Sequence, residues 1–146
     1  MSMSGRLLGG GLITPASRSA PSLDRVRAMS RDLRELLDEL QPATILIEWT
    51  KGKVGERRHQ GRGAGLAVYG GGMGYATATA DSWAADGCQV VGILENDWTR
   101  GVKKETRQLA VASMFDDYRA SQDPGGDMAD AIGMAVWWLK QRSLFR

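Results

Sequence analysis

Apolar and polar residues follow two periods along this chain, one typical of helices and one typical of buried strands. Leucine and valine recur at helical spacing between residues 22 and 40, where Ser22 can cap the helix and Pro42 ends it. Residues 44–49 and 89–94 are near-continuous apolar runs, which predict strands buried on both faces beneath helices. Further helices are predicted over residues 64–85, 103–115 and 128–140. Strands that alternate with helices predict an α/β fold, and the length of 146 residues predicts a single domain over 1–146.

Three segments are less regular. Arg6–Ile13 is expected to form a short strand at a sheet edge, although three glycines interrupt it. Gly70–Gly72 should weaken or break the helix over 64–85. Residues 51–62 and 116–126 are expected to be loops. The residues available for packing on the last two helices are Leu109, Val111, Ala112, Phe115, Ile132, Ala135, Val136 and Leu139.

Composition excludes several classes of protein. Cys88 is the single cysteine, so no internal disulfide can form, and His59 is the single histidine, so the zinc ligands of a Cys/His cluster are missing. No apolar run is long enough for a membrane span, and the first twelve residues lack the apolar stretch of a signal peptide. We therefore expect a cytoplasmic protein. The formal net charge of +2 is small, so the positions of the basic residues matter more than their total.

Three acidic residues are candidates for metal binding. Glu48 is a charged residue within an apolar strand, where it is costly unless it is paired or bound to a metal. Asp127 and Asp130 are three residues apart at the start of the last helix, so their carboxylates share one face. Hard oxygen ligands favour Mg²⁺ or Mn²⁺. In the alternative interpretation, Glu48 pairs with a buried arginine, and Asp127 merely caps the helix.

Two groups of basic residues could hold nucleic-acid phosphates. The first comprises Lys51, Lys53, Arg57, Arg58 and Arg62, and the second comprises Arg100, Lys103, Lys104 and Arg107. Such groups bind the backbone mostly without reading sequence; the alternative is a solvated loop and a solvated helix face. Trp49 and Trp98 could stack on bases or belong to the core. The glycine-rich runs lack the context of a nucleotide-binding loop, so no nucleotide cofactor is expected.

In their order and spacing, the segments between about residues 41 and 140 resemble the RuvC-like Holliday junction resolvases, which have the RNase H fold. The residues that carry the resemblance are Ile45–Glu48, Gln60–Ala64, Val102–Lys104 and Asp127–Ala135. The resemblance implies a mixed sheet flanked by helices and a metal-dependent endonuclease that acts on branched DNA, usually as a homodimer. It makes Glu48, Asp127 and Asp130 metal ligands for Mg²⁺ or Mn²⁺, and it places Lys103 or Lys104 near the scissile phosphate.

The chain departs from this family at its start. The family opens with a strand whose Asp, followed by Gly, supplies a further metal ligand, whereas residues 1–15 look like the second strand of that hairpin. Either the start has been set too late or this form has lost the ligand. Three hypotheses follow: an active endonuclease, a non-catalytic relative that binds branched DNA, and a helical interaction protein that assembles through Trp137 and Trp138.

Overall fold

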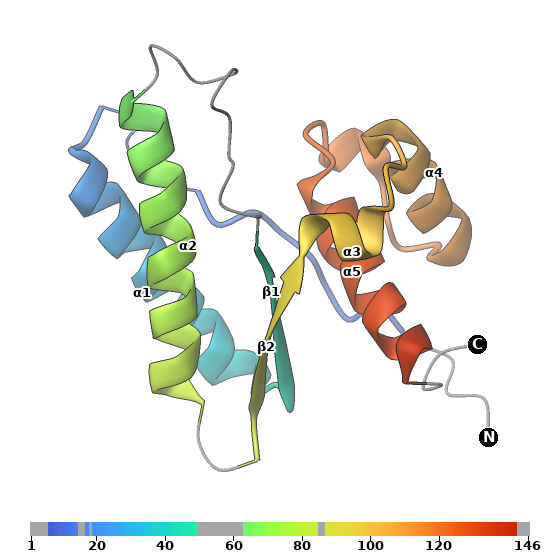
Figure 1. The fold of residues 1–146 in the computed structure, drawn as a ribbon, viewed down its shortest axis with the longest axis horizontal. Helices are drawn as coiled ribbons and strands as arrows, with labels where there is room; N and C mark the ends of the chain where they lie inside the picture. Colours follow the sequence, from blue (N-terminus) through green and yellow to red (C-terminus); the bar gives the residue numbers. More distant parts are fainter. Residues whose placement is uncertain (1–5, 15–16, 18, 50–62, 85–86, 143–146) are drawn as a thin grey trace. The chain divides into compact units, whose positions relative to one another are not determined.

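The computed structural model describes residues 6–14, 17, 19–49, 63–84 and 87–142, and over residues 63–70 it describes the backbone alone. The chain divides into two compact units, one of residues Ile13–Ile93 and one of residues Met1–Leu12 with Leu94–Arg146. Figure 1 shows the elements of both units. The α/β class predicted from the sequence is confirmed, and the described strands form a small parallel sheet of two. No helix in the described ranges is long and apolar enough to cross a membrane.

The Ile13–Ile93 unit contains a strand–helix–strand arrangement preceded by a long helix. Its elements in chain order are α1 (Ser22–Leu40), β1 (Thr44–Trp49), α2 (Gly63–Trp83) and β2 (Gln89–Leu94). The crossover through α2 lets β1 and β2 lie side by side in the same direction. Helix α1 packs along α2, and α2 contacts β1. All four elements were predicted from the sequence: the bounds of α1, β1 and β2 agree with the prediction, and those of α2 differ by one residue at its start and two at its end.

Helix α1 confirms the predicted end but corrects the predicted start. Ser22 is already the first helical residue, Pro21 precedes it, and no side chain caps the helix. The prediction that Ser22 caps α1 is therefore wrong. At the other end, Gln41 takes a left-handed conformation and its backbone N–H donates to the Leu37 carbonyl at 2.9 Å. Pro42 follows at once, in agreement with the expected stop.

Two further expectations about this unit are wrong for physical reasons. All six residues of β1 are half-buried rather than buried, and in β2 only Ile93 is buried, because the described sheet has two strands and so little width to cover. Helix α2 continues through Gly70–Gly72 instead of breaking there. The Gly71 backbone faces Val26 of α1, whose methyl group would lie 3.8 Å from an added Cβ, so packing against α1 outweighs the weak helix propensity of glycine.

The second unit is helical in its described part. It contains α3 (Glu95–Thr99), α4 (Lys104–Met114), a single 3₁₀ turn (Ala120–Gln122) and α5 (Asp127–Gln141). Helix α5 contacts both α3 and α4. The short helix α3 was not predicted. Val111, Tyr118 and Ala129 form a buried cluster, and Leu7, Phe115, Met128 and Ile132 pack against it.

Two predictions for this unit are wrong. Leu109 and Ala112, which were expected to pack, are both exposed, Leu109 with 72% of its surface. Residues 6–14 have no regular secondary structure, so the strand predicted over Arg6–Ile13 is not formed there. Gly9–Gly11 carry no side chains that would favour an extended strand. The segment is held by side chains instead, since Leu7 packs on the cluster around Val111.

Candidate metal and phosphate site

Helix α5 presents two carboxylates from its first turn, as the spacing in the sequence predicts. Asp127 is the first residue of the helix and Asp130 lies one turn further along. The Asp127 side chain is 66% exposed, whereas the Asp130 side chain is 19% exposed. The pair therefore has one member open to solvent and one at the edge of the packed core. An ion or a phosphate in solution can reach this end of the helix.

Lys104, the first residue of α4, joins the two carboxylates. Its Nζ atom lies 2.6 Å from Oδ1 of Asp127 and 3.4 Å from Oδ2 of Asp130. Partial burial by itself would lower the pKa of Lys104, but the hydrogen bond to Asp127 and the charges of both carboxylates outweigh it, so the pKa is raised. The two aspartates are thus oriented to share one cation.

Arg107, one turn after Lys104, binds Asp130 through two parallel hydrogen bonds. Its Nε donates to Oδ1 at 2.8 Å and its Nη2 donates to Oδ2 at 3.0 Å. Its Nη1 also donates to the Val102 carbonyl. The guanidinium lies over the ring of Trp98, with 5.2 Å from Cζ to the ring centroid. Because the planar guanidinium group has hydrogen-bond partners at its edge and a tryptophan ring on its face, both Arg107 and the Asp130 carboxylate are held in fixed orientations.

Trp98 supports this arrangement from the core. The residue is buried, so its interpretation as a core residue is confirmed. Its six-membered ring lies so close to Gly133 of α5 that an added Cβ would be 3.1 Å from Cζ3. Glycine at this position therefore lets α3 approach α5, which brings the tryptophan ring beneath Arg107. Trp138 is also buried, with Arg142 over its ring at 3.9 Å.

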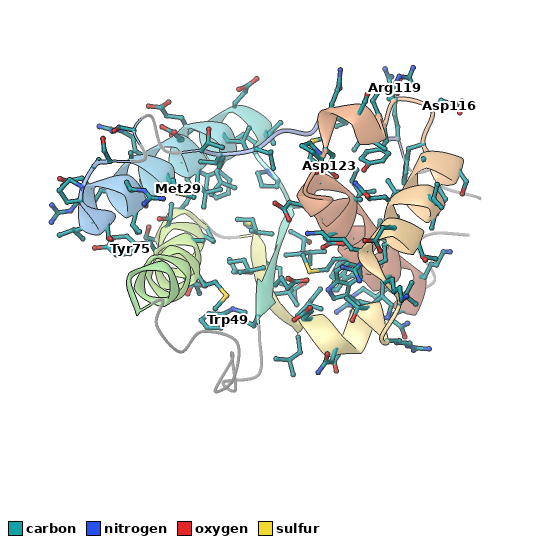
Figure 2. All side chains as sticks on the ribbon, turned by 90° about the horizontal axis from the view of Figure 1, so that it is seen from above. Met29, Trp49, Tyr75, Asp116, Arg119 and Asp123 are labelled. Atoms are coloured by element: carbon teal, nitrogen blue, oxygen red, sulfur yellow. The ribbon has the colours of Figure 1, made fainter. Side chains whose placement is uncertain are left out.

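Asp123 is the residue of this region that the sequence analysis missed. It is fully buried, although it lies in a loop, and Figure 2 shows it beside the start of α5. Its Oδ1 accepts from the Met128 N–H at 3.2 Å, and its Oδ2 accepts from the Ala129 N–H and the Tyr118 hydroxyl, both at 2.9 Å. Its backbone carbonyl accepts from Gln108 of α4 at 2.7 Å. One residue thus connects α4 to the helix that carries both candidate ligands.

The environment of Asp123 keeps it charged. Burial by itself would raise its pKa, but the N–H groups of Ala129 and Met128 and the hydroxyl of Tyr118 stabilise the carboxylate, so the pKa is lowered. Burial, followed by the hydrogen bond to Asp123, raises the pKa of Tyr118. The sequence did contain a signal for this role of Asp123. The segment Asp-Pro-Gly-Gly precedes the helix, and its last residue, Gly126, has no side chain that could cap it. An upstream aspartate can then supply the missing acceptor.

Glu48 lies in β1, where it is half-buried and has interaction partners. It belongs to the Ile13–Ile93 unit, whereas Asp127 and Asp130 belong to the other unit. The meeting of these three acids stays a prediction. Among the described residues, no group of three or more His, Cys, Asp or Glu side chains is arranged to hold a metal ion.

The donors on α5 fit a hard divalent cation in kind. Asp127 and Asp130 offer carboxylate oxygens, which Mg²⁺ and Mn²⁺ prefer. An ionised carboxylate has about four lone-pair sites, and Arg107 uses two of those on Asp130. The remaining lone pairs can coordinate a metal ion. Lys104 shows that one positive charge can reach both aspartates.

The predicted phosphate-binding residues are only partly described. Lys51, Lys53, Arg57, Arg58 and Arg62 lie outside the described residues. Arg100 and Lys103 are exposed on either side of the turn between α3 and α4, close in sequence to Lys104. Arg100 has a left-handed backbone conformation with φ of 48°. Their contact with nucleic acid stays a prediction.

Comparisons of this chain with protein-family models, with curated proteins and with solved structures found no match. The assignment of a function therefore depends on the residues themselves and on the geometry described above.

Proposed function

We propose that this protein is a metal-dependent endonuclease that cleaves Holliday junctions or other branched DNA and has an RNase H-like fold. The observation that supports the proposal best is the convergence of Asp127 and Asp130 on one positive charge, the Lys104 ammonium group. Solvent reaches this position through the exposed Asp127. The proposal also includes a homodimer and a cytoplasmic location, as the resemblance and the composition suggested.

In this proposal, Glu48, Asp127 and Asp130 hold Mg²⁺ or Mn²⁺. The bound ions would activate a water molecule and stabilise the departing oxygen of a phosphodiester. Arg107 holds the Asp130 carboxylate in a fixed orientation through its two hydrogen bonds. Arg100, Lys103 and the basic residues of the 51–62 segment would hold backbone phosphates, so binding should weaken as salt increases.

The proposal is tested by cleavage of a synthetic four-way junction in Mg²⁺ or Mn²⁺. We expect Glu48→Gln, Asp127→Asn and Asp130→Asn each to lower the cleavage rate by at least about 100-fold, since losing even an outer partner of a metal ligand costs about 10–100-fold. Asp116→Asn is the matched control, because Asp116 is an exposed aspartate of the same unit. Wild-type rates in Glu48→Gln or Asp130→Asn would reject the proposed ligands.

A second candidate function is binding of branched DNA without cleavage. It is favoured by one observation, namely that Lys104 and Arg107 already balance the charges of Asp127 and Asp130. A protein of this kind would bind junctions in a salt-sensitive manner and would cut none of them with any divalent ion. Junction and linear duplex of equal length, compared in one binding and cleavage series, separate the two candidates.

A further inference from the structure

Lys104 differs from Arg107 in how firmly it is held. Arg107 has two bonds to Asp130, one to the Val102 carbonyl and a tryptophan ring beneath it, and its side chain is 15% exposed. The Lys104 side chain is 37% exposed, and its contacts are made by a single ammonium group at the end of a flexible stem. Of the two cations in the cluster, Lys104 is the one that can leave without disturbing the core.

The charges of the four side chains determine how the departure of Lys104 would affect metal binding. Lys104 and Arg107 carry two positive charges, and Asp127 and Asp130 carry two negative charges, so the four groups are neutral together. A divalent ion approaching the aspartates would meet no net attraction while the ammonium group is in place. Once Lys104 leaves, one net negative charge remains, and the oxygens that faced the ammonium become free to bind the ion.

We propose that Lys104 is the resident counter-ion of Asp127 and Asp130, and that a divalent ion binds these aspartates by displacing it. The inference rests on the proposed function, because it concerns the same pair of carboxylates. The displaced ammonium group then becomes available to a phosphate oxygen of the nucleic acid, from the first residue of α4. Lysine pairing and metal binding are therefore competing states of a single site.

The competition is measured by titrating the full-length protein with Mn²⁺ in a calorimeter, without any nucleic acid. We expect Lys104→Met to bind Mn²⁺ at least about fivefold more tightly than the wild type, since the ion no longer has to break a partly exposed ion pair. Lys103→Met is the matched control, because it removes the same charge from the exposed neighbouring residue. Its affinity should equal that of the wild type.

A second measurement uses the wild type alone and does not depend on the folding of a variant. The rate of acetylation of the Lys104 amine is followed by mass spectrometry with and without Mg²⁺, with Lys103 as the internal reference. We expect Mg²⁺ to raise the rate at Lys104 severalfold relative to Lys103, because an amine released from two carboxylates is more accessible. An unchanged ratio would overturn the exchange.

The outcomes separate the failure of this inference from the failure of the proposed function. Equal or weaker Mn²⁺ affinity in Lys104→Met overturns the exchange, while metal-dependent junction cleavage by the wild type would leave the endonuclease intact. Mn²⁺ binding that persists in Asp127→Asn and Asp130→Asn, with no junction cleavage by the wild type, overturns both. Tighter binding in Lys104→Met alone, with faster acetylation in Mg²⁺, supports the exchange.

Discussion

Replacing Asp123 by alanine should destabilise this protein strongly, although the residue lies in a loop. The change removes the acceptor for the N–H groups of Met128 and Ala129 and for the hydroxyl of Tyr118, in a place that is fully buried. A hydrogen bond to a charged group contributes about 1.5–3 kcal/mol, and loss of a helix cap costs about 1 kcal/mol. Because these terms overlap, we expect a total loss of about 3–4 kcal/mol.

The loss is a large fraction of the roughly 5–15 kcal/mol that stabilises a domain. It is measured by urea denaturation at pH 7, and the melting temperature should fall by about 6–15 °C. Tyr118→Phe removes only one of the donors and should cost about 1 kcal/mol. Asp116→Ala changes an exposed aspartate close by in sequence and should cost less than about 0.5 kcal/mol. If Asp123→Ala cost no more than Asp116→Ala, the proposed role of Asp123 would be refuted.

The same carboxylate predicts part of the response to acid. The pKa of Asp123 is lower in the folded protein than in the unfolded chain. The charged Asp123 therefore makes its full contribution to the free energy of unfolding above about pH 4. That contribution is lost as the pH falls through the folded-state pKa. The difference in unfolding free energy between wild type and Asp123→Asn should therefore be constant near neutral pH and shrink in acid. A difference that stays constant down to pH 2 would show that Asp123 is not charged in the folded protein.

Two glycine substitutions test the packing around the carboxylate pair. Gly126 has φ of +70°, and an added Cβ would lie 2.8 Å from Cε of Lys104, so Gly126→Ala should cost about 1–2 kcal/mol and loosen Lys104. Gly101→Ala is the control: Gly101 has φ of +77° and open space around it, so this change introduces the backbone strain without a steric clash. Equal Lys104 acetylation rates in Gly126→Ala and Gly101→Ala would contradict the predicted clash between residue 126 and Lys104. Gly133→Ala should press on Trp98 at 3.1 Å and cost about 1 kcal/mol. Tryptophan fluorescence and urea denaturation measure this effect, and wild-type values in both would contradict the close approach of α3 to α5.

The sequence by itself determined the longer helices, both strands of the described sheet and the location of the candidate ligands on α5. Helices α1, α4 and α5 and both strands were predicted because their apolar residues recur at the period of each element, a signal that depends on neighbours along the chain. The placement of Asp127 and Asp130 on one face of α5 follows from helix geometry alone. The glycine run of α2 misled the prediction, since propensity is a weak local preference.

Only the tertiary structure decided which charges meet. Lys104 is separated by 23 residues from Asp127, as is Arg107 from Asp130, and no periodicity joins such positions. The packing of α4 against α5 brings the two pairs into contact. The role of Asp123 was likewise not predicted from the sequence, although Gly126 has no capping side chain, because an aspartate in a loop is ordinarily solvated. Its burial follows from the folding of α5 and Tyr118 around it, since the helix start has no capping side chain of its own and the buried N–H groups require an acceptor.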